Sequence, residues 1–185
     1  MRIIGGKYRG KKLYSPEGKN VRPTSERARE AIFNILFSHI NEAYENLDLA
    51  DIFAGTGAFG LEAVSRGFKS VTFVDINTNT IEKNVKMFPQ DQQKFNILQA
   101  NAIHLPVLKK SFHLVFMDAP YAKGLSQKVL HELITKNWLQ EKALCIVEIR
   151  ADEQIEIPGE FELIDQRNYG LAKILFLQKT AYEAN

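Results

Sequence analysis

The sequence predicts an α/β protein built around a mostly parallel sheet with helices on both faces. From residue 47 onwards, strand-like and helix-like segments alternate, an order typical of repeated β-α units. The last two strand-like segments follow each other without a helix, which predicts a C-terminal antiparallel hairpin. The 185 residues, 45% hydrophobic and 25% charged, suit one globular domain, or one domain with a small appendage.

Each element of the main body follows from hydrophobic periodicity and turn residues. We expect strands at 49–53, 70–74, 95–98, 112–117, 143–149, 161–167 and 172–178, giving a seven-stranded sheet. We expect helices at 59–66, 78–87 and 126–137. Gly67 ends the first of these helices, and Asn168 to Gly170 turns the final hairpin.

A small extension precedes this body. Short strands at 2–4 and 12–14 around Gly5 and Gly6 predict a hairpin. A helix follows, beginning at Thr24 or Ser25. Its expected apolar face consists of Ala28, Ala31, Ile32, Ile35, Leu36 and Ile40. We therefore predict a basic N-terminal hairpin and helix over residues 1–45 and a main domain over residues 46–185.

Positive charge is concentrated in the extension. Residues 1–29 hold nine Lys or Arg and two Glu, a formal charge of +7, whereas the remainder carries −5. A basic arm on an acidic body favours a polyanionic partner. Tyr8 and Tyr14 lie among these charges and can stack on bases. A solvated face without a partner is the alternative.

The composition also points to a compartment. No stretch reaches the roughly 18 uncharged residues of a membrane helix, and the first ten residues lack the apolar run of a signal peptide. The single cysteine, Cys145, lies in an apolar run and is expected to fill the core. The histidines show no metal-ligand spacing, so we expect no metal site. These features predict a cytoplasmic protein without membrane contact, and we expect a monomer.

A glycine-rich turn follows the first predicted strand. Gly55, Gly57 and Gly60 form G-x-G-x-x-G at the start of a helix, where free N–H groups and a close backbone approach suit a ligand. Asp75 ends the next strand and can accept both hydroxyls of an adenosine ribose. The pattern predicts a Rossmann-like cofactor site and fits NAD, FAD and S-adenosylmethionine (SAM). A tight turn that binds nothing is the structural alternative.

Two features favour SAM. Asp51 lies four residues before Gly55, and its charge suits an ammonium or sulfonium group better than a pyrophosphate. The main domain also leaves little room for the separate substrate domain of a dehydrogenase. By position, Asn101 and Ala102 can meet the adenine edge. The expected cofactor-binding residues are Asp51, Phe53, Ala54, Gly55, Thr56, Gly57, Gly60, Asp75, Ile76, Asn101 and Ala102.

The tetrapeptide Asp118-Ala119-Pro120-Tyr121 follows the fourth strand, where ligands of open α/β sheets bind. A carboxylate and a backbone carbonyl can accept the two hydrogens of an exocyclic amine and hold its nitrogen in line with a methyl group. Tyr121 can stack on an extruded base, and Pro120 restricts Ala119 to extended conformations. We expect these four residues to be catalytic. The alternative is a strand that ends in an Asp-Pro turn with a packed tyrosine.

These segments resemble the RsmD family of bacterial methyltransferases, which act on N2 of a guanine in 16S ribosomal RNA. The resemblance covers essentially the whole chain, and its most specific parts are residues 2–10 and 21–35. Residues 51–63 and 73–75 are similar to the SAM-binding motifs of the family. The family's catalytic motif is Asp-Pro-Pro-Tyr/Phe. Here Ala119 replaces the first proline and retains the backbone carbonyl.

The resemblance implies a Rossmann-like SAM-dependent methyltransferase fold and methylation of N2 of guanine 966, in the family's naming. It also implies that the base is flipped and that the substrate is 16S rRNA in an assembled or partly assembled small subunit. We expect two groups of RNA contacts: Arg2, Lys7, Arg9, Lys11 and Lys12 on phosphates, and Arg22, Thr24 and Arg27 nearer the target nucleotide.

Two other functions stay open. One is SAM-dependent N-methylation of another amine or amide, such as adenine N6 in DNA or a protein glutamine, because those families share the same catalytic logic. The other is a catalytically weak rRNA-binding assembly factor, which is suggested by Ala119 in place of the first proline of the family's catalytic motif. The intact glycine-rich turn, Asp75 and Asp118 argue against the second function.

Overall fold

The structure is a computed structural model that describes residues 1–15, 26–40, 43–120 and 124–181. Its helices are α1 (Glu26–His39), η1 (Tyr44–Asn46), α2 (Ala58–Ser65), α3 (Asn79–Val85), η2 (Pro89–Lys94) and α4 (Leu125–Thr135). Its strands are β1 (Asp48–Ile52), β2 (Ser70–Asp75), β3 (Phe95–Gln99), β4 (Phe112–Asp118), β5 (Leu139–Arg150), β6 (Phe161–Tyr169) and β7 (Ala172–Lys179). No helix in these ranges is long and apolar enough to cross a bilayer.

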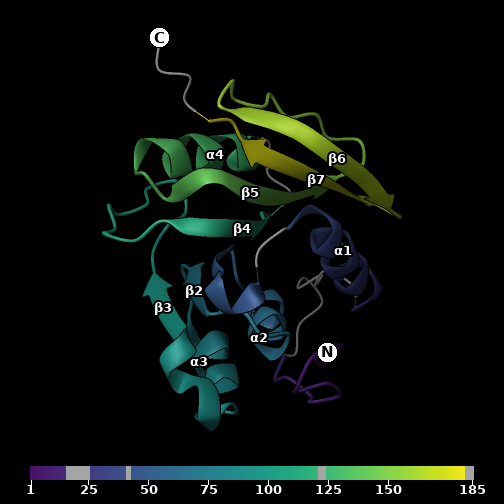
Figure 1. Ribbon diagram of the computed structural model, residues 1–185, viewed down its shortest axis with the longest axis vertical. Helices are drawn as coiled ribbons and strands as arrows, with labels where there is room; N and C mark the ends of the chain where they lie inside the picture. The colour runs from purple at the N-terminus through teal and green to yellow at the C-terminus, as the bar shows by residue number, and fades with distance from the viewer. Residues whose placement is uncertain (16–25, 41–42, 121–123, 182–185) are drawn as a thin grey trace.

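All seven strands form one sheet in the order β3-β2-β1-β4-β5-β7-β6. Strands β1 to β5 pair in parallel, and β7 runs antiparallel to both β5 and β6. In Figure 1 the sheet runs from β6 and β7 at the top to β3 at the bottom. The predicted α/β class, strand number and C-terminal antiparallel hairpin are confirmed.

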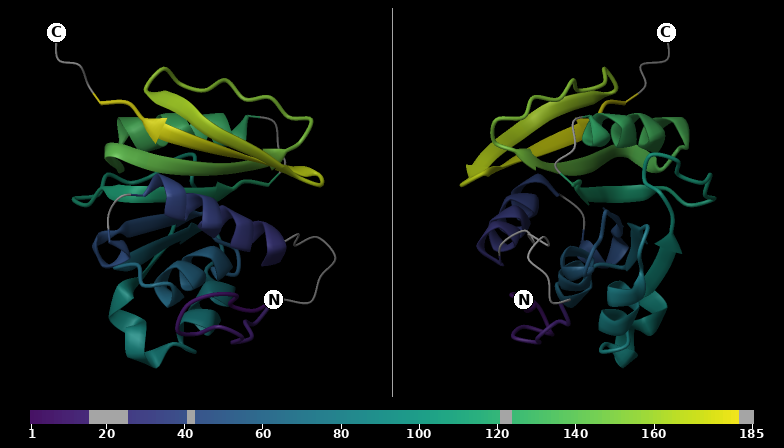
Figure 2. Two further views of the ribbon diagram at one scale, coloured as in Figure 1. Left: turned by 45° about the vertical axis from the view of Figure 1, so that its right-hand side comes forward. Right: turned by 180° about the vertical axis from the view of Figure 1, so that it is seen from behind.

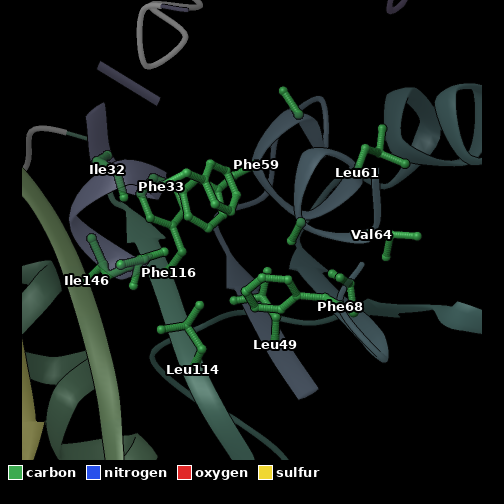
Figure 3. Close-up of a cluster of buried hydrophobic side chains, with 14 of the residues drawn as sticks. Ile32, Phe33, Leu49, Phe59, Leu61, Val64, Phe68, Leu114, Phe116 and Ile146 are labelled. Atoms are coloured by element: carbon green, nitrogen blue, oxygen red, sulfur yellow. The ribbon is translucent and has the colours of Figure 1, made fainter. Parts of the chain in front are cut away.

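A hydrophobic core lies on each face of the sheet, because successive strand residues point to opposite sides. On one face, α1 and α2 cover residues such as Leu49 and Phe116. On the other face, α4 covers residues such as Ala50 and Val115. Figure 3 shows the first core, where the Phe59 ring stacks on Phe116 with centroids 3.8 Å apart. The prediction of helices on both faces is confirmed.

Strand β5 begins at Leu139, four residues before the start predicted from hydropathy. Lys142 adopts a positive φ of 58°, and the register of β4 against β5 shifts between Phe112 and Leu114. This irregularity carries the strand through polar residues that interrupt the apolar run. Hydropathy alone therefore placed the strand start too late.

The N-terminal segment, residues 1–15, is a tight loop packed on α2. Its strand-like pairing is limited to one bridge between Arg2 and Lys12. The Lys7 N–H donates to the Ser65 carbonyl at 2.8 Å, and the Tyr8 N–H donates to Ser65 Oγ at 2.9 Å. Ile3 is fully buried in the same core as α1 and α2. The segment thus packs on the body of the molecule (Figure 2).

Helix α1 buries a face that differs in part from the predicted one. Ala28, Ile32 and Leu36 are buried as expected, but Phe33 and Arg29 are buried as well. The Arg29 Nε donates to Glu62 Oε2 of α2 at 2.7 Å, and Arg66 binds the other oxygen of the same carboxylate. Arg29 therefore contributes to a buried ion pair, and its charge is not part of an exposed basic surface. The predicted helix start at Thr24 or Ser25 lies outside the described residues.

Candidate active site

Carboxylates from three neighbouring strands meet at one edge of the sheet. Asp51 is in β1, and β1 lies between β2, which ends at Asp75, and β4, which ends at Asp118. Ile52 pairs in register with Val74 on one side and Met117 on the other. Asp75 and Asp118 therefore flank the first residue after β1. The structure brings together three of the predicted site residues.

Asp51 is 2% exposed, and its Oδ2 accepts a hydrogen bond of 3.0 Å from the Gly60 N–H. Burial raises the pKa of Asp51 well above its usual range, and the charges of Asp118 and Asp75 raise it further. The Gly60 hydrogen bond and the more distant Arg29 offset only part of this effect. A cation that reached this edge would stabilise the ionised form of Asp51.

The glycine-rich turn has the conformation that its sequence predicts. Gly55 and Gly57 have positive φ values of 57° and 74°, which favour glycine. A Cβ on Gly60 would lie 2.5 Å from Phe73 Cε1 and 2.6 Å from Val71 Cγ1. Only glycine at position 60 therefore lets α2 pack this closely on β2. Phe53 also has a positive φ, 58°, so the backbone bends away from β1 before the glycines.

Asp75 is held across this turn. Its Oδ2 accepts from the Gly55 N–H at 2.8 Å, and its Oδ1 accepts from the Asn77 N–H at 3.0 Å. A carboxylate has about four acceptor positions, so two hydroxyl groups can still bind. The next residue, Ile76, is 70% exposed and presents an apolar side chain beside the carboxylate. This pair of residues suits a ribose and the flat ring attached to it.

After β3, Asn101 and Ala102 differ in the groups that they expose to a ligand. Asn101 is exposed, and its Oδ1 accepts from the Ile103 N–H at 3.2 Å. The side chain of Ala102 is 3% exposed and packs in the α4 core. Ala102 can therefore offer a ligand only its backbone.

At the end of β4, Asp118 is partly exposed and Pro120 is exposed, whereas Ala119 is 4% exposed. Glu148 of β5 pairs in register with Asp118 and is buried, so a fourth carboxyl group lies at this edge. Its position at the end of a strand was the only sequence signal for it. Tyr121 lies outside the described residues.

The basic residues of the N-terminal extension fall into two groups. Arg2 pairs with Glu26 at 3.0 Å, Lys7 pairs with Asp91 at 2.7 Å, and Lys11 Nζ donates to the Met87 carbonyl. The second group consists of Arg9, Lys12 and Arg27. Their side chains are exposed and make no ion pair or hydrogen bond with the residues that the structure describes. Arg22 and Thr24 lie outside those residues.

No group of three or more His, Cys, Asp or Glu side chains that could hold a metal occurs within the described ranges. Cys145 is fully buried in β5, and burial raises the pKa of its thiol. The prediction that it fills the core is confirmed.

The strand order, the glycine-rich turn after β1 and the acidic residue that ends β2 define a Rossmann-like α/β protein of the methyltransferase class. Within this class, the chain belongs to the RsmD family: residues 1–178 match the family described as conserved hypothetical protein 95.

Relatives match along almost the whole chain. Ribosomal RNA small subunit methyltransferase D of Escherichia coli K12 is 31% identical over 184 residues, covering 98% of this chain and 91% of that protein. The protein of the same name from Haemophilus influenzae is 29% identical and covers 96% and 93%. A solved structure of a candidate methyltransferase from Escherichia coli has a TM-score of 0.84 at 30% identity and covers 98% of both chains.

Proposed function

We propose that the protein transfers a methyl group from SAM to the exocyclic N2 of a guanine, guanine 966 in the family's naming, in the 16S rRNA of the small ribosomal subunit. The observation that carries this proposal is the group of carboxylates from β1, β2 and β4 at one sheet edge, in a chain that aligns over almost its whole length with relatives named ribosomal RNA small subunit methyltransferase D. We propose that it acts as a cytoplasmic monomer on an assembled or partly assembled subunit.

The carboxylate edge fits the charges of SAM. Asp75 is assigned to the ribose hydroxyls, with Ile76 against the adenine and Asn101 and the Ala102 backbone at its edge. The turn over residues 53–57, with Gly60 at the start of α2, takes the methionine part. Asp51 favours a positively charged ligand, because burial and two neighbouring carboxylates oppose its ionisation without one. This requirement separates SAM from the negatively charged pyrophosphate of a dinucleotide.

SAM supplies an electrophilic methyl group to this edge. Asp118 and the Ala119 carbonyl accept hydrogen bonds from the two N–H groups of the guanine amine, which turns the nitrogen lone pair towards the methyl carbon. Methyl transfer would leave S-adenosylhomocysteine and place positive charge on the amine, and the Asp118 carboxylate would stabilise that charge. One amine proton then leaves to solvent. Pro120 limits the backbone of residue 119, and Tyr121 is assigned to stacking on the base.

The N-terminal extension is assigned to the RNA. Arg9, Lys12 and Arg27 are exposed and supply phosphate contacts directly. Arg2, Lys7 and Lys11 also face solvent in part, but their charges are shared with internal partners. Arg22 and Thr24 are assigned to the neighbourhood of the target nucleotide by their place in the sequence. Residues 1–45 would then select the substrate, and residues 46–185 would hold the cofactor and the reacting groups.

The test is incubation of the protein with labelled SAM and small subunits from cells that lack the enzyme, followed by digestion and identification of the labelled nucleoside. Label in N2-methylguanosine at one site of 16S rRNA is the expected result. Label in a glutamine of a subunit protein, or label in N6-methyladenine of added DNA with none in the subunits, would replace this proposal with the second function. SAM binding and subunit binding without label transfer would favour the assembly-factor function.

A further inference from the structure

The side chain of Asn84 joins three parts of the molecule. It is fully buried in α3, the helix that follows Asp75. Its Nδ2 donates to the Thr56 carbonyl of the glycine-rich turn at 2.8 Å and to the Tyr14 carbonyl at 3.0 Å. Its Oδ1 accepts from the Tyr14 N–H at 2.7 Å. One amide therefore connects the turn, the N-terminal segment and α3.

A second contact joins the same two regions. The Thr56 hydroxyl, in a residue that is 6% exposed, donates to Met1 Sδ at 3.3 Å. Both the carbonyl and the side chain of Thr56 are thus held by contacts that involve the N-terminal segment. Further along, Lys7 and Tyr8 fix the segment to Asp91, with bonds of 2.9 and 2.6 Å. The segment is thus held to the glycine-rich turn, to the last turn of α3 and to η2, the helix after it.

We propose that Asn84 is a positioning residue that couples binding of the cofactor at the glycine-rich turn to binding of RNA by the N-terminal segment. The inference rests on the proposed function. A movement of the turn or of the segment would break at least one of the three bonds of Asn84 and leave a buried polar group without a partner. Each ligand therefore stabilises the arrangement that the other ligand needs, and the effect is reciprocal.

The chemistry of the amide explains why asparagine suits this position. The side chain at this position must donate two hydrogen bonds, to the carbonyls of Thr56 and Tyr14, and accept one from the Tyr14 N–H. Among side chains of this size, only an amide offers that set. Aspartate keeps the size and the acceptor but loses both donors, so it isolates the two bonds to Thr56 and Tyr14.

The first measurement is the affinity for S-adenosylhomocysteine, a probe that cannot transfer a methyl group, by calorimetry. We compare the wild type with Asn84→Ala and Asn84→Asp, at a temperature where all variants are folded. Ile81→Val is the matched control, because Ile81 is fully buried in the same helix and its truncation also lowers stability. Both Asn84 variants should bind about 10-fold more weakly, equivalent to one broken hydrogen bond. Ile81→Val should stay within about twofold of the wild type.

The second measurement repeats the titration with saturating unmethylated small subunits. In the wild type, the subunits should raise the affinity for the probe at least about fivefold. In both Asn84 variants this ratio should fall to about one, whereas Ile81→Val should keep it. Unchanged probe affinity in the Asn84 variants, or equal ratios in variant and wild type, would overturn the coupling. A wild type that binds no probe would instead contradict the proposed function.

Discussion

Asp48 and Asp51 lie three residues apart on β1 and are both buried, yet their surroundings are opposite. Asp48 Oδ1 accepts from Ser70 Oγ at 2.6 Å and from Lys110 Nζ at 2.8 Å, and Lys69 lies 3.6 Å from Oδ2. Burial opposes the ionisation of Asp48, but Lys110, Ser70 and Lys69 outweigh it and lower its pKa. For Asp51, burial and two carboxylates raise the pKa.

The two residues illustrate two uses of a buried charge. At the amino end of β1, the partners of the carboxylate come from the protein itself, so Asp48 contributes to the stability of the fold. At the carboxyl end, the protein supplies one N–H to Asp51 and adds two further carboxylates. Such a site costs stability and is typical of a functional position. The same distinction applies to the described basic residues of the extension: Arg2, Lys7 and Lys11 have internal partners, whereas Arg9, Lys12 and Arg27 have none among the described residues.

The largest effect is expected at Asp118, the carboxylate assigned to the reacting amine. Asp118→Asn should lower the rate of methyl transfer by about 100-fold or more, because an oriented charge is lost where positive charge develops. Single-turnover transfer to small subunits measures this rate. Asp48→Asn is the control and should transfer at the wild-type rate. An Asp118→Asn variant with near wild-type transfer would show that this carboxylate serves only the end of the strand.

The second prediction exchanges the two aspartates of β1 for asparagine. Asp48→Asn should lower the free energy of unfolding by about 2 kcal/mol, because Lys110 loses its buried anion, and should leave SAM affinity unchanged. Asp51→Asn should keep or raise the free energy of unfolding but weaken SAM binding about 10-fold. Urea denaturation and calorimetry measure the two quantities. A loss of stability in Asp51→Asn, with unaltered SAM binding, would show that Asp51 stabilises the fold and does not bind SAM.

The third prediction concerns the basic side chains of the N-terminal segment, residues 1–15. The double variant Arg9→Ala, Lys12→Ala should weaken subunit binding and reduce the slope of log affinity against log salt by about 1.5, because two phosphate contacts are lost. Lys7→Ala, its counterpart, should reduce the slope less and lower stability instead, since Asp91 is 3% exposed and loses the nearer of its two cations. Filter binding at several salt concentrations measures the slope. Equal slopes in the double variant and the wild type would exclude Arg9 and Lys12 as RNA contacts.

The smallest expected effect is an opposite pH dependence of stability. The lowered pKa of Asp48 stabilises the fold above the unfolded pKa near 3.8, and this contribution is lost as pH falls through the folded value. The raised pKa of Asp51 means that the folded state loses stability as pH rises through the folded value. The advantage of wild type over Asp48→Asn should therefore shrink on acidification from pH 6 to 3. The advantage of Asp51→Asn over wild type should grow from pH 4 to 8. Parallel curves for the two variants would contradict the comparison.

The sequence by itself determined the order and type of nearly all elements, because hydrophobic alternation and turn residues are local properties. It also predicted the glycine-rich turn and Asp75, since a positive φ and a strand end are encoded within a few residues. The family resemblance extended this to the expected chemistry of Asp118. The start of β5 was missed, because the polar residues 140–142 separate Leu139 from the apolar run that begins at Ala143.

Only the tertiary structure decided which charges are paired. Lys110, the partner of Asp48, is 62 residues away along the chain, and no local pattern identifies it. In the same way, the sequence places Arg29 among the basic residues of the extension, whereas the structure shows it buried in an ion pair with Glu62. Asn84 stands in an ordinary helical segment of the sequence and becomes a junction only through contacts with Thr56 and Tyr14. The physical reason is that burial and pairing depend on side chains that only packing brings within hydrogen-bond distance, whereas helix and strand periodicity depends on near neighbours.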